Sequence, residues 1–180
     1  MGISIEQLRE LCDPKLTEQR AEVTQEIHFA QSQLSIEQLR TQLDDALTLL
    51  ALEAQQESDM YWSVHNAMRA ESKQQEQVRI GTRVRIHGNV SLVAEWYRNR
   101  FVNQPNQDRM TVYSTYIPKG KGFSYSLSHF KDEPEWAQVL IARVESRYAK
   151  IRKRANVLTK IRRAVNEYQQ LLLKDFADKS

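Results

Sequence analysis

The sequence predicts an α+β fold in which two long helical arms form an antiparallel coiled coil or bundle, with a four-stranded antiparallel sheet inserted between them. Four of the five glycines and two of the four prolines lie between residues 81 and 122, and these residue types punctuate turns and break long helices. Apolar residues follow helical spacing on both flanks and alternate with polar residues in the middle. We expect one composite domain, with an acidic arm over 1–77, a sheet region over 78–131 and a long basic helix over 132–180 that packs on the first arm.

The first arm is rich in Gln, Glu, Leu and Ala, which are good helix formers. The string Ser-Ile-Glu-Gln-Leu-Arg begins at Ser4 and again at Ser35, and each copy places Gln three residues after Ser, as in a capping box. We interpret the two copies as two helix starts, with Asp13-Pro14 ending the short first helix. The apolar seam of the second helix is expected, with one interruption, at Leu39, Leu43, Ala46, Leu50, Met60, Val64 and Ala67.

The second arm is predicted to begin at Glu133-Pro134-Glu135, where two acids and a proline suit a first helical turn. It continues without a helix breaker to about Phe176. Its first seam position is expected at Ile151, Leu158, Val165 and Leu172, and its second at Ile161 and Tyr168. A helix of about 40 residues with one apolar stripe is not stable alone, so it should pack against the first arm.

The middle segment carries the period of β-strands. Around Val84, apolar residues alternate with Arg79, Arg83 and Arg85, which predicts a strand with one apolar and one basic face. We expect four strands, over residues 78–87, 89–101, 110–117 and 123–130. The hairpin turns are predicted at Gly88-Asn89 and at Pro118–Gly122.

Charge is divided unevenly along the chain. Residues 1–78 contain 6 Lys/Arg and 14 Asp/Glu, a net charge of −8, whereas residues 79–180 contain 20 Lys/Arg and 9 Asp/Glu, a net charge of +11. This asymmetry predicts a polyanionic partner for the basic half, and a solubilising or self-docking role for the acidic half, through which the chain could form homo-oligomers. The alternative is that the opposite charges pair two packed helices.

The basic half predicts binding to nucleic acid. Between residues 143 and 163 only Glu145 interrupts a basic stripe about 30 Å long, which suits phosphate contacts but could also be a solvated coiled-coil face. Strand arginines could read guanine edges, and aromatic residues of the sheet could stack on unpaired bases or form the core. The predicted nucleic-acid-binding residues are Arg79, Arg83, Arg85, Arg98, Arg100, Lys119, Lys121, Arg143, Arg147, Lys150, Arg152, Lys153, Arg154, Arg162 and Arg163.

Catalytic chemistry is not expected, nor is a metal or another cofactor. The four histidines are dispersed, and the single Cys12 has no recognisable base and excludes both an internal disulfide and a cysteine-based zinc site. Tyr113 or Tyr116 could in principle attack DNA, but such enzymes need a histidine triad for their metal. No apolar run approaches the roughly 18 residues of a membrane span, so we expect a soluble, cytoplasmic protein without a membrane partner.

Several strings of the basic half resemble the MobI family of conjugative transfer proteins. They are Gly88–Trp96, Tyr116–Tyr125, Glu135-Trp136 and Glu145–Arg152, and the resemblance covers about residues 85–165. It implies an auxiliary mobilisation factor of conjugative plasmids and integrative elements, which acts at the origin of transfer and helps a separate relaxase. We therefore expect a non-enzymatic DNA-binding accessory factor. The alternative is a coiled-coil structural or adaptor protein whose basic half binds an acidic protein.

Overall fold

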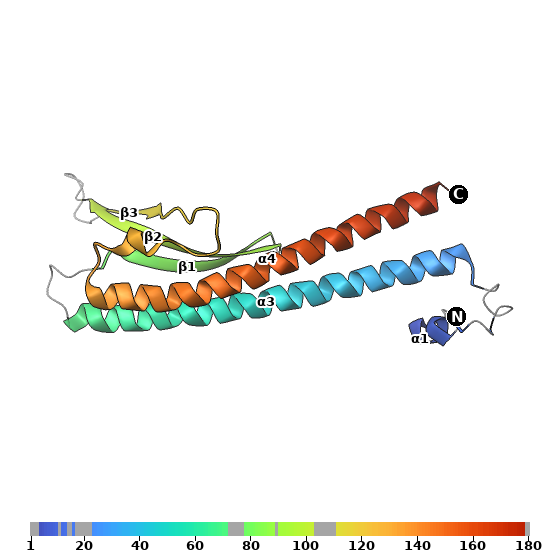
Figure 1. The fold of residues 1–180 in the computed structure, drawn as a ribbon, viewed down its shortest axis with the longest axis horizontal. Helices are drawn as coiled ribbons and strands as arrows, with labels where there is room; N and C mark the ends of the chain where they lie inside the picture. The colour runs from blue at the N-terminus through green and yellow to red at the C-terminus, as the bar shows by residue number, and fades with distance from the viewer. Residues whose placement is uncertain are drawn as a thin grey trace. The chain divides into compact units, whose positions relative to one another are not determined.

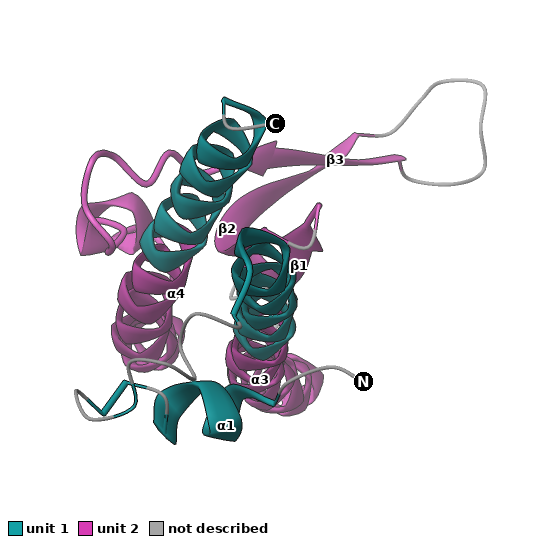
Figure 2. Cartoon of the chain, turned by 90° about the vertical axis from the view of Figure 1, so that its right-hand side faces the viewer, with its two compact units in different colours: residues 1–43, 160–180 teal, residues 44–159 magenta. Residues whose placement is uncertain are grey.

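A computed structural model of the chain describes residues 4–10, 12–13, 16, 23–71, 78–88, 90–102 and 111–178. Its elements are α1 (Ile5–Glu10), α3 (Gln25–Glu71), β1 (Ile80–His87), β2 (Ser91–Val102), β3 (Thr111–Tyr116), the 3-10 helix η2 (Leu127–Phe130) and α4 (Glu135–Ala177) (Figure 1). The α+β class is therefore confirmed. The chain forms two compact units, unit 1 with residues 1–43 and 160–180 and unit 2 with residues 44–159, and both long helices contribute to each (Figure 2).

The two helix starts predicted from the repeated string have different outcomes. At the first copy the capping box is present, because Gln7 N donates to Ser4 Oγ at 3.3 Å and Ser4 N donates to Gln7 Oε1 at 2.8 Å. At the second copy the prediction is wrong, because Ser35 lies inside α3 and its hydroxyl donates to the carbonyl of Gln31 at 3.0 Å. The helix formers that precede Ser35 have already started the helix ten residues earlier, at Gln25.

In unit 1 the first part of α3 and the last part of α4 run antiparallel. Phe29 stacks on Phe176 with ring centroids 4.2 Å apart. Arg40 donates to Asn166 at 3.0 Å and to Gln169 at 2.6 Å. Phe29 is nearer the start of α3 than Arg40 is, and its partner Phe176 is nearer the end of α4 than the partners of Arg40 are. This is the order that antiparallel helices require.

The predicted seams match the buried positions only in part. On α4, Ile151 and Val165 are buried, but Ile161 and Tyr168 of the expected second seam position are exposed. On α3 the stripe continues through the expected interruption. Its buried residues are Ile36, Leu43, Leu47, Leu50, Ala54, Ser58, Tyr61 and His65. The pairing of the arms as a coiled coil therefore stays a prediction.

In unit 2 an antiparallel sheet of order β1-β2-β3 packs one face on α3 and α4 (Figure 1). Trp96 of β2 is fully buried at the centre of this core, and its ring meets Tyr61 of α3 edge to face at 5.2 Å. The ring of Tyr148 of α4 also lies near it, with ring centroids 5.8 Å apart. The alternation predicted for the first two strands thus places their apolar residues in the core.

The fourth predicted strand, over residues 123–130, is wrong, and the sheet has three strands. The chain here satisfies its backbone with side chains of α4 instead of with another strand. Tyr125 N donates to Glu145 at 2.8 Å, and the carbonyl of Phe123 accepts from Arg152 at 2.7 Å. Leu127–Phe130 then forms the 3-10 turn, which the Ser126 side chain caps.

The first predicted hairpin is present, but His87 pairs with Ser91, so three residues rather than two connect the strands. Gly88 adopts a φ of +56°, which glycine tolerates at such a turn. The described residues do not include three of the predicted breaks and strand ends, which are Pro14, Asn89 and Met110.

Candidate nucleic-acid interface

Five basic side chains are exposed along the part of α4 that belongs to unit 2. We call Arg143, Arg147, Lys150, Lys153 and Arg154 the helix stripe. All of them except the first line a pocket of about 370 Å³, together with one acid of α3. Helical spacing brings these cations together, because residues three or four positions apart are neighbours on a helix surface.

Two arginines of the helix stripe are paired with acids of α3. Arg154 donates to both carboxylate oxygens of Glu53 at 2.7 Å, and Arg147 lies 3.9 Å from Glu57. Lys150 and Lys153 form no ion pair with any of the residues that the structure describes. The alternative that opposite charges join the two helices therefore holds for the two arginines, whereas the two lysines present their charge to solvent.

Arg152 does not belong to this surface, although we predicted it as a nucleic-acid-binding residue. Its side chain is 7% exposed and pairs with Glu145, which is 4% exposed, at 2.8 and 3.0 Å. The same guanidinium donates to the carbonyls of Ala94 and Phe123 at 2.9 and 2.7 Å. The sequence did carry a signal, because Glu145 is the one acid of the basic run and lies two helical turns before Arg152, on the same face.

The carboxylate of Glu145 also accepts hydrogen bonds from outside α4. Trp96 Nε1 donates to it at 2.7 Å and Tyr125 N at 2.8 Å. The guanidinium of Arg152 lies 4.9 Å from the ring centroid of Tyr125. The Glu145–Arg152 pair thus joins α4, β2 and the segment after β3, and it acts on the position of the sheet rather than on a phosphate.

The strand arginines lie on the face of the sheet that points away from the helices, as the alternation predicts. Arg83 and Arg85 both donate to Oε1 of Glu95, on the neighbouring strand, at 2.7 and 2.6 Å. Their partner is therefore an acid of the sheet and not of the first arm. The guanidinium of Arg83 also lies over the rings of Tyr116 at 4.5 Å and Tyr97 at 5.9 Å.

Three further predicted arginines line one pocket, to which the residue before β1, β2 and the end of β3 contribute. Arg79, Arg98 and Arg100 line a pocket of about 450 Å³, together with His129 and Tyr116. Arg98 donates to the carbonyl of His129 at 2.9 Å and lies 3.6 Å from a carboxylate oxygen of Glu133. We call this cavity the edge pocket.

The remaining predicted cations lie elsewhere. The ammonium group of Lys119 donates to the carbonyl of Gly122, across the turn that also carries the exposed Lys121. Arg162 and Arg163 belong to the part of α4 in unit 1. Apart from the buried Arg152, the other fourteen predicted residues are distributed over the helix stripe, the sheet with its edge pocket, this turn and unit 1, and only the first two gather more than two of them.

The aromatic residues of the sheet region divide between core and surface. Trp96, Tyr125 and Phe130 are buried, whereas Phe101, Tyr113, Tyr116 and Phe123 are exposed. Burial raises the pKa of Tyr97 despite the opposing charge of Arg83, and it likewise raises the pKa of Tyr125. The structure therefore places the first three in the core, whereas stacking on bases stays a prediction for the four exposed rings.

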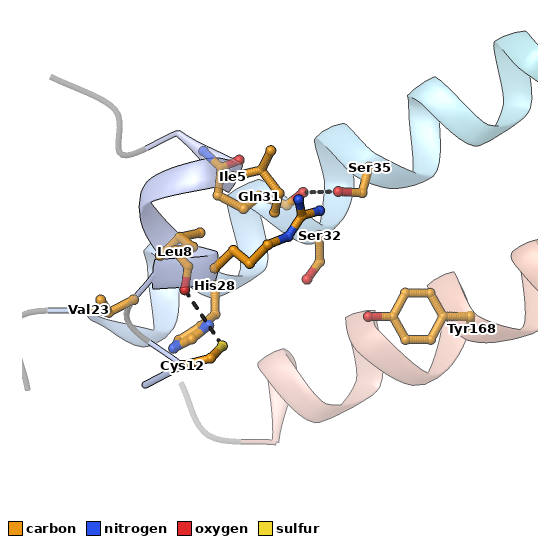
Figure 3. Close-up of a pocket in the computed structure, with 10 residues that line it drawn as sticks. Ile5, Leu8, Cys12, Val23, His28, Gln31, Ser32, Ser35 and Tyr168 are labelled. Carbon is orange, nitrogen blue, oxygen red and sulfur yellow. Dashed lines mark hydrogen bonds between the residues drawn. The ribbon is translucent and has the colours of Figure 1, made fainter. Parts of the chain in front are cut away.

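Unit 1 contains a pocket of about 500 Å³ between α1, the start of α3 and the end of α4 (Figure 3). Cys12 and His28 both line it, and Cys12 Sγ donates to the carbonyl of Leu8 at 3.6 Å. Sequence reasoning found no base for Cys12 and did not bring His28 into its neighbourhood. No hydrogen bond between this thiol and imidazole is present among the described residues.

The described part of the chain offers neither a membrane span nor a metal site. None of its helices combines the length and the apolar character that crossing a membrane requires. No group of three or more His, Cys, Asp and Glu side chains there is arranged to hold a metal ion.

A comparison with protein families tests the resemblance found in the sequence. The family model described as MobI protein matches residues 50–166, which include the sheet, the helix stripe and the edge pocket. Comparisons with curated proteins and with solved structures gave no match. The family match extends over more than half of the 180 residues, so the chain belongs to the MobI family and is a mobilisation-related protein.

Proposed function

We propose that the chain is a non-enzymatic DNA-binding accessory factor of conjugative transfer, which binds the origin of transfer and assists a separate relaxase. Membership of the MobI family supports the setting of mobilisation. The observation that carries DNA binding is the helix stripe, where Lys150 and Lys153 are exposed and form no ion pair with the described residues, beside Arg147 and Arg154.

The balance of charge at the helix stripe favours a phosphate backbone as its ligand. Five cations stand against two acids, Glu53 and Glu57, so the group has a net charge of +3. Exposed ion pairs contribute at most about 1 kcal/mol, so a phosphate can compete for the paired arginines as well. Contacts of this kind give affinity and position without reading sequence.

The same side chains support a division of labour with a relaxase. Ammonium and guanidinium groups at neutral pH donate hydrogen bonds and attract phosphates, but they are neither nucleophiles nor bases. We propose that the chain holds DNA and that the separate enzyme cuts it.

The test is the salt dependence of duplex binding by the double variant Lys150→Gln/Lys153→Gln. Each lost phosphate contact lowers the slope of log affinity against log salt by about 0.9, so the slope should fall by about 2. The loss should be equal on transfer-origin and unrelated duplexes. The variant Lys131→Gln/Lys174→Gln removes the same charge from exposed positions outside the stripe and should keep the slope. An unchanged slope in the Lys150/Lys153 variant would remove the stripe from the interface.

A second candidate function is a structural or adaptor protein whose basic half binds an acidic protein. The ion pairs of Arg154 with Glu53 and of Arg147 with Glu57 favour it, because they use stripe charges to join two helices. This function predicts no binding to any DNA even at low salt, whereas the first requires binding that weakens steeply as salt rises. Recovery of a relaxase with the full chain from donor cells would further support the first.

A further inference from the structure

The three strands leave one face of the sheet outside the core. We define the outer sheet face by Arg83, Arg85, Glu95, Tyr97 and Tyr116, which alternation and register place on the same side. None of the five belongs to the hydrophobic core cluster. The helices of unit 2 cover the opposite face, where Trp96 is buried.

The flat groups of the outer sheet face are held in place before any ligand arrives. Glu95 binds the guanidinium of Arg83 at 2.7 Å, and this group lies 4.5 Å from the ring centroid of Tyr116. The glycine at position 81 leaves room for the ring of Tyr97, because a Cβ there would lie 2.5 Å from it. Tyr116 is 49% exposed, so an aromatic ring and an arginine plane lie together at the surface.

Cations lie beside these flat groups. Tyr116 is also a lining residue of the edge pocket, which has a volume of about 450 Å³. Strand alternation, however, places Arg98 and Arg100 of that pocket on the opposite face of the sheet, with Trp96. The outer sheet face itself carries Arg83 and Arg85 against Glu95, for a net charge of +1, so its own arginines lie beside the exposed ring.

This combination distinguishes between possible ligands. In a duplex the bases stack on one another and offer only their edges, which arginines can contact but on which the exposed ring of Tyr116 cannot stack. An unpaired base can stack on both kinds of surface, as in many single-strand-binding proteins. An acidic protein would use the arginines but would give no role to the exposed ring beside them.

We propose that the outer sheet face binds single-stranded DNA. An unpaired base stacks on Tyr116 and Arg83, and Arg85 contacts a neighbouring phosphate. This inference rests on the proposed DNA-binding function and adds to it a strandedness and a second site.

The experiment compares binding of fluorescent oligo(dT) and of a duplex of equal length by fluorescence anisotropy. Tyr116→Ala should weaken binding to oligo(dT) by about 5- to 100-fold, the loss of one stacked base, and leave duplex binding unchanged. Tyr116→Phe keeps the ring and should bind oligo(dT) like the wild type. The matched control is Tyr113→Ala, because Tyr113 lies on the same strand with 51% exposure but on the opposite face.

A second measurement locates the contact directly. Oligo(dT) carrying 5-iododeoxyuridine should, on irradiation, crosslink to the peptide at Tyr116 rather than at Tyr113. Crosslinks elsewhere, unchanged affinity of Tyr116→Ala for oligo(dT), or equal losses on both DNAs would each overturn this site. Wild-type binding to the duplex alone would overturn the inference and leave the proposed function standing. Binding to neither DNA would overturn the proposed function too.

Discussion

Replacing Arg152 with alanine should destabilise unit 2 strongly, although Arg152 lies within the most basic stretch of the chain. The substitution removes both bonds to the Glu145 carboxylate, at 2.8 and 3.0 Å, and leaves that carboxylate buried. It also removes the guanidinium N–H groups that donate hydrogen bonds to the carbonyls of Ala94 and Phe123. The first carbonyl belongs to β2 and the second to the segment that sequence reasoning took for a fourth strand.

The structure sets the expected size of the loss. Removing one partner of a buried ion pair costs about 3–5 kcal/mol, because the other charge stays buried without compensation. Here Glu145 keeps the hydrogen bonds from Trp96 Nε1 and Tyr125 N, so we expect about 3 kcal/mol. For a chain of this size, that corresponds to a fall in melting temperature of roughly 6–12 °C.

The assay is thermal unfolding followed by circular dichroism, with Arg154→Ala as the matched control. Arg154 lies two residues further along α4, and its ion pair with Glu53 is 52% and 42% exposed, so its loss should cost less than about 1 kcal/mol. Equal melting temperatures for Arg152→Ala and Arg154→Ala would refute the structural role of the buried pair. Loss of DNA affinity by Arg152→Ala without loss of stability would return Arg152 to the interface.

Two further predictions concern stability. Burial raises the pKa of Tyr61 and of Tyr148, so above pH about 10 the unfolded chain releases protons that the folded chain keeps. These tyrosines should therefore leave the free energy of unfolding unchanged below that pH and lower it above that pH by about 1.4 kcal/mol per pH unit for each tyrosine. Tyr61→Phe should make this decrease with pH less steep, as measured by urea unfolding. Gly81→Ala should lower the free energy of unfolding by roughly 1–3 kcal/mol, because its Cβ would lie 2.5 Å from the Tyr97 ring. In the control Gly122→Ala the Cβ would lie no closer than 3.9 Å to another atom, so this variant should have the melting temperature of the wild type.

The long elements could be predicted because their signals are local. The helix formers that flank the glycine-rich middle give α3 and α4, and the alternation around Val84 gives β1. The string over residues 123–130 alternates equally well, yet its backbone bonds to Glu145 and Arg152. No local pattern shows that a backbone will be satisfied by side chains from a distant helix, so the fourth strand was predicted wrongly.

The parts of the candidate site that depend on charge and on helical or strand periodicity could be predicted from the sequence. Helical spacing identifies the helix stripe, and strand alternation places Arg83 and Arg85 on one face. Their partner could not be predicted, because the register of β1 against β2 decides that Arg83 lies opposite Glu95. The edge pocket also depends on register, since it combines Arg79, the end of β2 and the end of β3.

If unit 2 has one surface for duplex DNA and another for unpaired bases, its binding should favour opening of the duplex. Under the proposed function, the helix stripe holds duplex through its phosphates, and the outer sheet face holds bases that only an opened strand exposes. A ligand that binds one state of an equilibrium favours that state by mass action, here the opened DNA. Tyr116→Ala should then leave the chain on the transfer origin but reduce the reactivity of its thymines to permanganate, which attacks unpaired bases. Lys150→Gln/Lys153→Gln should weaken occupancy and opening together, since the stripe brings the chain to the duplex.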